Sequence, residues 1–479
     1  MKKNDFSRRS FLKKTIIASS AAAISPSLLL AGTNILKSSK IIGANGKVNL
    51  ACCGIGNRGA EIIEALYATG LANIVALCDV DMEAPHTAKI LGKFPDVPRF
   101  KDFRKMFDKM ANQIDAVSIG VPDHSHFPIT MMAMSLGKHV YVEKPLARTF
   151  HECELLIKAA KKYPNVVTQM GNQGHSEANY FQFKAWKEAG IIKDVTAITA
   201  HMNSPRRWHG WDTKITSLPS NGNIPDTLDW DLWLASSQPH KFDKDFINGQ
   251  WRCWYDFGLG ALGDWGAHII DTAHEFLELG LPYEINPVKL DGYNKFFFPQ
   301  ASTIAFKFPE RKGMPALDIT WYDGINNLPP IPNGYGVSGL DPNIPPPSTG
   351  KLEPVKLNPG KIIYSKDLTF KGGSHGSILS IIPEEKAKDM ASILPEVPKS
   401  PSNHFKNFLL ACKGEEKTRS PFEISGPLSQ VFSLGVLTQR LNTKIVFDRK
   451  KNTITNSKIA NQLLMGPPPR KGWEQYYKV

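Results

Sequence analysis

Three glycines at G-x-G-x-x-G spacing constrain this chain more than any other feature. Gly54, Gly56 and Gly59 follow the apolar run 48–53 directly, and a helical pattern of apolar residues begins at once. In such a turn the first glycine permits a sharp bend and the second lets the backbone approach a pyrophosphate. The third lets the helix pack close to the strand, with its N-terminal amides aimed at the phosphates. The spacing therefore predicts a dinucleotide-binding turn.

An acidic residue stands where the ribose of such a dinucleotide would lie. The next strand-like run, 74–78, ends at Asp79, twenty residues after Gly59. A carboxylate in this place accepts hydrogen bonds from the adenosine ribose and repels a 2′-phosphate, so we expect NAD in preference to NADP. Taken singly, the glycines could form an ordinary turn and Asp79 could be a polar strand end. The two features together favour the dinucleotide.

The first 44 residues predict an export signal and a linker. Ser7-Arg8-Arg9-Ser10-Phe11-Leu12-Lys13 resembles a twin-arginine motif, and a moderately apolar stretch interrupted by Ser and Pro26 follows it. That stretch is too weak for a stable membrane span, so we expect none in the mature protein. Twin-arginine export carries folded proteins, which suits a protein that acquires a dinucleotide in the cytoplasm. We expect a periplasmic protein; a disordered basic tail is the alternative.

The charge and the cysteines exclude other classes of protein. Of the formal net charge of +13, residues 1–31 contribute +5, because they hold six Lys or Arg and one Asp. The remaining charge is scattered, as on a solvated surface, so no nucleic-acid partner is expected. Six cysteines in 479 residues make no disulfide framework, and neither C-x-x-C nor H-x-x-x-H occurs. We therefore predict no metal site.

Short apolar runs alternate with helical patterns over residues 45–170. This alternation predicts an α/β fold with a doubly wound parallel sheet. The expected strands are 48–53, 74–78, 114–120, 138–142 and 166–169, and the expected helices are about 57–69, 83–91, 102–110, 126–136 and 149–162. Ligands bind beyond the carboxyl ends of such strands, where Pro122-Asp123-His124-Ser125-His126 and Glu143-Lys144-Pro145 stand.

The pattern changes after residue 170, which predicts a second domain over 171–445 and a tail of little pattern over 446–479. Residues 325–350 are crowded with proline, so we expect an irregular insertion loop there. The expected strands are 195–201, 284–290, 302–308 and 316–322, and the expected helices are about 178–189, 402–413 and 423–441.

A second group of reactive side chains follows three glycines within residues 256–275. Asp264 and His268 are spaced i, i+4 and would share one face of a helix. Joined to Lys144, they supply what oxidation of a carbinol requires, because a proton must leave the hydroxyl as hydride leaves the carbon. We expect His268 to act as acid/base, Lys144 to polarise the oxygen and Asp264 to orient the sugar or His268. The roles of Lys144 and His268 are interchangeable at this stage.

The glycine turn, P-D-H-S-H, E-K-P and the D-x-x-x-H helix together resemble the Gfo/Idh/MocA oxidoreductases over about residues 47–445. The resemblance implies a C-terminal α+β domain on a large open, mainly antiparallel sheet, Lys144 beside nicotinamide and substrate, and a homo-oligomer (dimer or tetramer). The bond to Pro145 is expected to be cis. The expected cofactor-binding residues are Gly54, Gly56, Asn57, Arg58, Gly59, Asp79, Pro122, His124, His126, Glu143, Lys144 and Asn172.

The substrate contacts are less sharply defined. They are expected to come from Lys144, His175, Trp251, Arg252, Asp264 and His268. Sugars stack on aromatic rings, so Trp251, Trp208 or Trp211 is expected in the pocket, with core packing as the alternative. Arg252 could instead form a surface salt bridge, Asn172 and His175 could be loop scaffolding, and His126 could cap a helix. Asp271 and His274 are expected to be structural.

These features predict an exported NAD-dependent oxidoreductase that acts on a hydroxyl of a sugar, glycoside or polyol and gives a keto-sugar. Free NAD is scarce outside the cytoplasm, so we expect the dinucleotide to stay bound and cycle, or an external acceptor to take the electrons. A second hypothesis is an NAD-dependent glycosidase that uses transient oxidation and elimination, as in some relatives with a twin-arginine signal. A third is a non-catalytic sugar-binding member, against which Glu143, Lys144, Asp264 and His268 speak.

Overall fold

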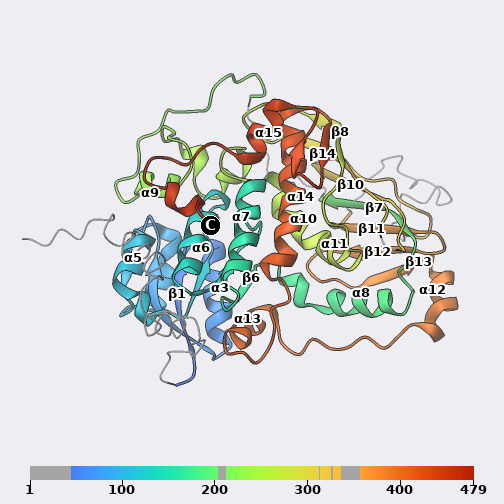
Figure 1. Ribbon diagram of the computed structural model, residues 1–479, viewed down its shortest axis with the longest axis horizontal. Helices are drawn as coiled ribbons and strands as arrows, with labels where there is room; N and C mark the ends of the chain where they lie inside the picture. Colours follow the sequence, from blue (N-terminus) through green and yellow to red (C-terminus); the bar gives the residue numbers. More distant parts are fainter. Residues whose placement is uncertain (1–44, 203–211, 312, 325–326, 336–356) are drawn as a thin grey trace, which may run out of the picture.

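The chain forms two domains side by side, joined by a long helix (Figure 1). The structure is a computed structural model and describes residues 45–202, 212–311, 313–324, 327–335 and 357–479. The predicted export signal, Trp208, Trp211 and most of the proline-rich segment therefore lie outside the described residues. Within the described part, none of the helices combines the length and apolarity needed to cross a membrane.

The N-terminal domain is built on a parallel six-stranded sheet of order β3-β2-β1-β4-β5-β6, which confirms the predicted doubly wound fold. The order reverses between β1 and β4, and ligands bind at such a switch point. Its strands are β1 Val48–Cys53, β2 Ala72–Cys78, β3 Arg99–Phe100, β4 Ala116–Ile119, β5 His139–Val142 and β6 Thr168–Met170. Its helices are α3 Asn57–Ala68, α4 Ala88–Lys93, α5 Phe103–Met110, α6 Asp123–Ser135 and α7 Phe150–Lys162.

The C-terminal domain is built on a nine-stranded sheet of order β13-β12-β11-β7-β10-β9-β8-β14-β15. Only β7 and β10 pair in parallel, so the sheet is mainly antiparallel, as expected. Its strands are β7 Val195–Met202, β8 Glu284–Asp291, β9 Ala301–Phe308, β10 Leu317–Gly324, β11 Gly360–Ser365, β12 Thr369–Gly373, β13 Leu379–Ile382, β14 Ile445–Asp448 and β15 Thr453–Ile454. The sequence did not predict β11 to β13, because these strands are short and glycines stand at the ends of β11 and β12.

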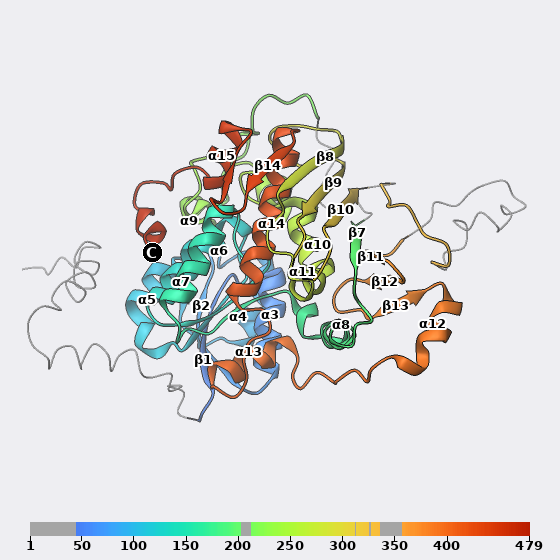
Figure 2. The ribbon, with the colours of Figure 1, turned by 45° about the vertical axis from the view of Figure 1, so that its right-hand side comes forward.

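Helix α14, Phe422–Leu441, joins the two domains. It lies between α7 of the first domain and α10, β8 and β9 of the second (Figures 1 and 2). Glycine at position 435 allows this close approach, because a Cβ there would meet Leu262 at 2.6 Å and Phe306 at 2.7 Å. The other helices of this half are α8 Ala178–Glu188, α9 Trp230–Leu234, α10 Gly260–Ile269, α11 Asp271–Phe276, α12 Glu384–Met390, α13 His404–Cys412 and α15 Lys458–Met465.

The C-terminal tail has more structure than its sequence pattern suggested. After β14, β15 and α15 it runs back across the molecule to the first domain and ends in the 3₁₀ helix Glu474–Tyr477 (Figures 1 and 2). Trp473 and Tyr476 are buried there against Phe103 of α5. The contacts are between segments hundreds of residues apart, so no local periodicity indicates them.

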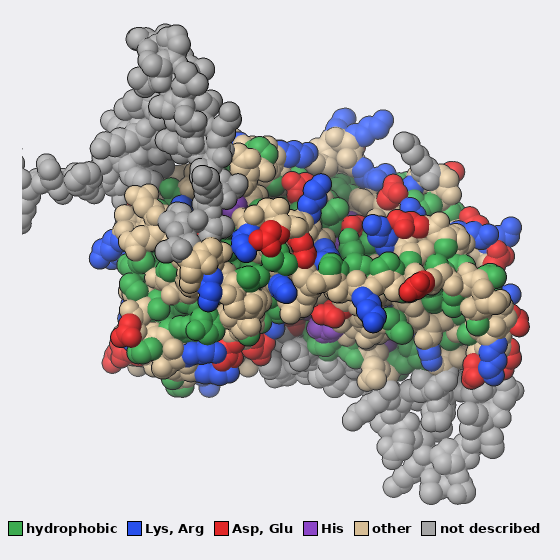
Figure 3. Space-filling view, turned by 90° about the horizontal axis from the view of Figure 1, so that it is seen from below, with side chains coloured by type: hydrophobic (Ala, Val, Ile, Leu, Met, Phe, Trp, Pro, Cys, Tyr) green, Lys and Arg blue, Asp and Glu red, His purple; other side chains and the backbone are tan. Residues whose placement is uncertain are grey.

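Charged side chains of both signs alternate over the described surface seen in Figure 3. Lys, Arg, Asp and Glu are interspersed on this face with hydrophobic side chains, and no continuous basic stripe crosses it. A nucleic-acid backbone is usually bound by clustered basic side chains, and this face offers no such cluster.

We expect Gly435→Leu to destabilise the joint on its second-domain side, where α14 packs against α10 and β9. Four extra carbons would overlap Leu262 and Phe306, and overpacking of this kind lowers the free energy of unfolding by about 1–3 kcal/mol. Urea unfolding measures the loss. Gly92→Leu on α4 is the matched control, because a Cβ there meets nothing within 4 Å, and its stability should be unchanged or higher. Equal stability of the two variants would contradict this account of the joint.

Candidate active site

The glycine turn has the tight geometry that the sequence predicted. Gly54 has φ +79°, and a Cβ on it would lie 2.5 Å from the carbonyl oxygen of Gly120. A Cβ on Gly59 would lie 2.1 Å from the Gly54 oxygen, so only glycine lets α3 approach β1 this closely. The first residue of α3 is Asn57, and Gly56 before it offers no side-chain cap. The helix therefore presents uncapped amides, as a pyrophosphate requires.

A cavity opens where these amides meet the ends of β1, β2, β4 and β5. The second domain closes it with residues 228–235 and 247–252. Of the residues expected to bind cofactor or substrate, the cavity is lined by Gly54, Gly56, Asn57, Arg58, Asp79, Pro122, His126, Glu143, Lys144, Trp251 and Arg252. It is not lined by Gly59, His124, Asn172, His175, Asp264 or His268.

Asp79 fixes the turn that faces it. One carboxylate oxygen accepts the amide of Ile55 at 2.9 Å and the other accepts the amide of Asp81 at 3.1 Å. Burial raises the pKa of Asp79, and these backbone hydrogen bonds oppose the rise. Each oxygen has a further lone pair, so the carboxylate can still accept a ribose hydroxyl.

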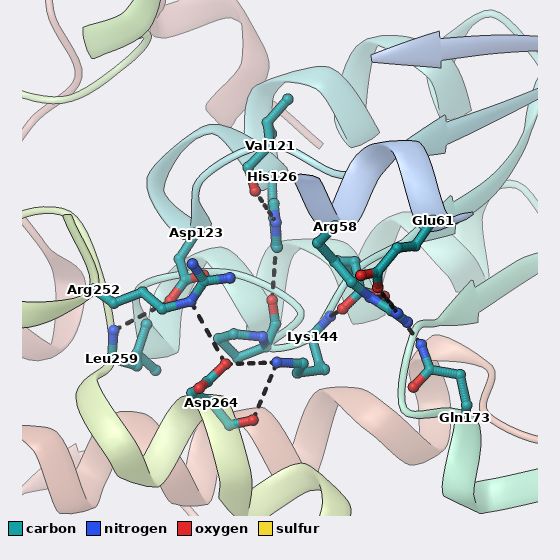
Figure 4. Close-up of polar contacts among 12 residues, drawn as sticks. Arg58, Glu61, Val121, Asp123, His126, Lys144, Gln173, Arg252, Leu259 and Asp264 are labelled. Atoms are coloured by element: carbon teal, nitrogen blue, oxygen red, sulfur yellow. Dashed lines mark hydrogen bonds and ion pairs between the residues drawn. The ribbon is translucent and has the colours of Figure 1, made fainter. Parts of the chain in front are cut away.

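Arg58 connects the glycine turn to the E-K-P turn. Its Nε and Nη2 both lie 3.2 Å from Oε1 of Glu143, and Gln173 donates to the same oxygen at 3.2 Å (Figure 4). The Glu143 side chain is nearly buried, and these donors supply the partners that a buried carboxylate requires. Arg58 therefore has a structural partner as well as a place in the cavity wall.

Lys144 spans the gap between the domains. The Lys144–Pro145 bond is cis, and Nζ of Lys144 donates to Oδ1 of Asp264 at 2.7 Å and to its backbone oxygen at 3.1 Å. The side chains of this pair are only 10% and 7% exposed. Nε of Arg252 lies 3.5 Å from the same Oδ1, so two cations face one carboxylate (Figure 4). Arg252 also stacks on Trp251, with 4.0 Å between its guanidinium carbon and the ring centroid.

Asp123 is a buried carboxyl of this site that was not among the residues predicted from the sequence. It lines the cavity at the start of α6 and accepts the amide of Leu259 at 3.2 Å. Burial raises its pKa to about 7, although Arg252 and Lys144 oppose the rise. The position of Asp123 in P-D-H-S-H, just beyond the end of β4, could have identified it as a site residue from the sequence. The two histidines of that motif are the more obvious candidates.

His268 lies one turn beyond Asp264 on α10 and is 6% exposed. Burial lowers its pKa well below 6.5, and the positive charge of Lys144 lowers it further. Its ring stacks on His375 with 3.9 Å between centroids, and Nδ1 has no hydrogen-bond partner in the described part of the chain. His375 lies in the loop between β12 and β13 and belongs to no motif, so no signal in the sequence could have found it.

The two histidines of P-D-H-S-H have different positions. His124 donates from Nε2 to the oxygen of Trp233 at 2.7 Å and packs between Trp233 and Phe257, away from the cavity. Burial lowers its pKa to about 3. The ring nitrogens of His126 face the oxygens of Pro145 at 2.8 Å and Val121 at 2.9 Å. Helix α6 begins at Asp123, earlier than predicted, so His126 is not a helix cap.

Asn172 and His175 lie behind α11 rather than at the cavity. The amide of Asn172 donates to Asp271 at 3.3 Å, and His175 lies between Asp271, at 3.1 Å, and Glu275. Burial alone would lower the pKa of His175, but hydrogen bonds to these two carboxylates raise it to about 9. His274 is bound to the Gly280 oxygen.

The raised pKa of His175 predicts that the stability of the fold depends on pH. A pKa raised from 6.5 to about 9 stabilises the fold fully below pH 6.5, and the contribution is lost as pH rises through 9. We expect the free energy of unfolding to fall by up to about 3 kcal/mol over this range. Urea unfolding at a series of pH values measures it. His175→Gln should be less stable at pH 6 and lack this fall, whereas His151→Gln on α7 should keep it. The same fall in both variants would contradict the assignment.

The glycine turn, the uncapped start of α3 and the sheet order define a two-domain protein whose first domain has a dinucleotide-binding fold. Residues 48–171 match the sequence model of the Gfo/Idh/MocA family described as the NAD-binding Rossmann fold, and residues 184–292 match its C-terminal alpha/beta domain. The chain belongs to the Gfo/Idh/MocA family of oxidoreductases.

Curated relatives fall into two functional groups. A Shewanella sp. (strain ANA-3) protein named glycosyl hydrolase family 109 protein 2 is 28% identical over 171 residues, which are 33% of this chain and 37% of the relative. The NADP(+) scyllo-inositol 2-dehydrogenase IolW of Bacillus subtilis is 26% identical over 197 residues, which are 41% of this chain and 43% of IolW. The aligned segments thus span less than half of either relative.

Solved structures agree in fold. The WlbA dehydrogenase from Chromobacterium violaceum, described in complex with NADH and UDP-GlcNAcA, has a TM-score of 0.54 at 13% identity and covers 85% of this chain and 97% of its own. An NAD-binding protein from Listeria innocua has a TM-score of 0.53 at 14% identity, with 84% and 97% covered.

Proposed function

We propose that the protein oxidises a hydroxyl group of a sugar, glycoside or polyol with NAD as hydride acceptor, as an exported enzyme. One observation supports this most: Lys144 from the dinucleotide-binding domain donates to Asp264 from the other domain, beside the cavity. This places a cation, a carboxylate and the imidazole of His268 at one boundary. The twin-arginine motif supports export, and the family supports redox chemistry.

The residues present fit a dinucleotide. Side chains at Gly54 or Gly59 would collide with backbone, and the start of α3 is uncapped, so the turn has room for a pyrophosphate and little else. Asp79 and Asp81 both line the cavity near the ribose position, and their negative charge supports NAD over NADP. When bound, the nicotinamide supplies the acceptor for hydride from the substrate carbon.

Side chains of this protein can take up the proton that leaves the substrate hydroxyl during hydride transfer. With its pKa depressed, His268 is neutral at neutral pH, and Nδ1 has no hydrogen-bond partner among the described residues. His268 lies behind the cavity wall, on the same helix as Asp264, and in this proposal its Nδ1 accepts the proton of the substrate hydroxyl. The Lys144 ammonium stabilises the negative charge that develops on the carbinol oxygen, and Asp264 holds that ammonium in place. Asp123, whose pKa burial raises to about 7, can take up or release a proton at the cavity wall.

We expect Lys144→Ala to lower turnover by several orders of magnitude while the dinucleotide stays bound. The variant loses the cation that stabilises the oxygen but keeps the glycine turn. Steady-state kinetics and the nucleotide content of the purified variant measure the two effects. Lys158→Ala, at a lysine whose side chain is 56% exposed on α7, is the control and should be unaffected. Wild-type turnover in Lys144→Ala would refute the proposed role of Lys144 in stabilising the carbinol oxygen.

A second candidate function is an NAD-dependent glycosidase, in which the same groups oxidise the sugar transiently so that elimination breaks the glycosidic bond. The names of the relatives favour it: besides the family 109 proteins, an alpha-N-acetylgalactosaminidase of Shewanella oneidensis is 27% identical over 205 residues. Both functions use Lys144 and His268.

Product analysis separates the two functions. We expect a glycoside incubated with the wild-type protein to yield a keto-sugar with the glycosidic bond intact, as mass spectrometry would show by a loss of two hydrogens. Lys144→Ala is the control for background hydrolysis. If the wild-type protein releases the unoxidised sugar and Lys144→Ala does not, the dehydrogenase function is ruled out and the glycosidase function is supported.

A further inference from the structure

Helix α9 forms the outer wall of the dinucleotide cavity. Leu232, Trp233 and Ala235 line the cavity from this side. The segment lies over the end of β2, because the amide of Asp229 donates to the Val80 oxygen at 3.1 Å. It therefore covers the part of the cavity next to Asp79, where the adenosine ribose is expected.

The hydrogen bonds within α9 are too few to hold this wall, which also depends on the buried aromatic cluster around Trp230 and Trp233. Helix α9 has only five residues, so most of its carbonyls have no partner within the helix. It ends at Ala235, whose φ of +48° and ψ of −125° are rare for a residue with a side chain. Such a conformation persists only where the surroundings impose it.

Arg470 of the C-terminal tail holds the carbonyl end of this segment. Its guanidinium donates to the Ala235 oxygen from Nε at 2.9 Å and from Nη2 at 2.6 Å, and Nη2 also donates to the Asp231 oxygen at 2.7 Å. Nη1 pairs with the Asp231 carboxylate, and the Arg470 amide donates to the Ser236 oxygen at 3.3 Å. The Arg470 side chain is 13% exposed. A cation at the carbonyl end of a helix is also favoured by the helix dipole.

The tail around Arg470 is anchored to the first domain. The guanidinium of Arg104 on α5 lies 4.6 Å from the centre of the Trp473 ring. The Tyr477 hydroxyl donates to Glu152 of α7 at 2.7 Å and lies 3.2 Å from the Ser236 hydroxyl. Figures 1 and 2 both show the tail crossing beside α9 toward α6. Arg470 thus ties a wall of the second domain to the body of the first.

We propose that Arg470 is a positioning residue that latches α9 over the adenosine end of the cavity and so slows release of the dinucleotide. This rests on the proposed function, because it presumes that a dinucleotide binds there. A latched cofactor stays with the protein through many turnovers.

The rate of NAD release tests the latch. Protein loaded with radiolabelled NAD is diluted into excess unlabelled NAD, and the label still bound is followed over time. We expect Arg470→Ala to release NAD at least tenfold faster than the wild type. Arg470→Lys should lie between, since an ammonium keeps the charge but cannot donate to both carbonyls in one plane. The control Lys471→Ala, at the exposed neighbour, should release NAD at the wild-type rate.

The outcomes separate the latch from the proposed function. If Arg470→Ala and Arg470→Lys fold, as a thermal melt shows, and release NAD at the wild-type rate, the latch is wrong and the proposed function stands. If Arg470→Ala does not fold, Arg470→Lys decides in the same way. If the wild-type protein takes up no NAD or NADP at all, the proposed function fails first.

Discussion

The ion pair between Lys144 and Asp264 is the interaction on which the rest of the site depends. Each group is nearly out of water, and a charge in that position is tolerated only when its partner is held against it. The pair therefore sets the position of α10 against the turn after β5. Glu143 beside Lys144 is held by Arg58 at the start of α3. Two ion pairs, joined through the backbone between Glu143 and Lys144, thus connect the glycine turn to α10 across the domain boundary.

Two buried histidines near this boundary show that burial alone does not set a protonation state. His268 faces Lys144 and the ring of His375, and its pKa lies well below the ordinary value. His175 lies between Asp271 and Glu275, and its pKa is raised. The neutral ring of His268 lies near the Lys144–Asp264 pair, whereas the charged ring of His175 binds α11 to the segment that precedes α8. The difference comes from the sign of the neighbouring charges.

Local patterns in the sequence predicted the first domain well and the site in part. Glycine spacing and apolar runs are properties of short segments, so the strands 48–53 and 138–142 and the D-x-x-x-H helix were identified from them. The remaining features depend on contacts between distant segments. His375 reaches His268 from a loop more than a hundred residues away, and burial in the folded chain, where Leu259 of the second domain donates to Asp123, raises the pKa of Asp123. No single-sequence pattern contains that information.

The return of the tail to the first domain has a consequence for how the chain is made. Trp473 and Tyr476 complete the packing around Phe103, although they leave the ribosome some 370 residues after it. Helix α14, which joins the domains, is also synthesised late. The dinucleotide-binding domain therefore lacks the packing of Trp473 and Tyr476 on Phe103 until the chain has been synthesised at least to residue 476. Pauses or chaperones that act on the nascent chain would meet a half-finished domain with an exposed apolar face.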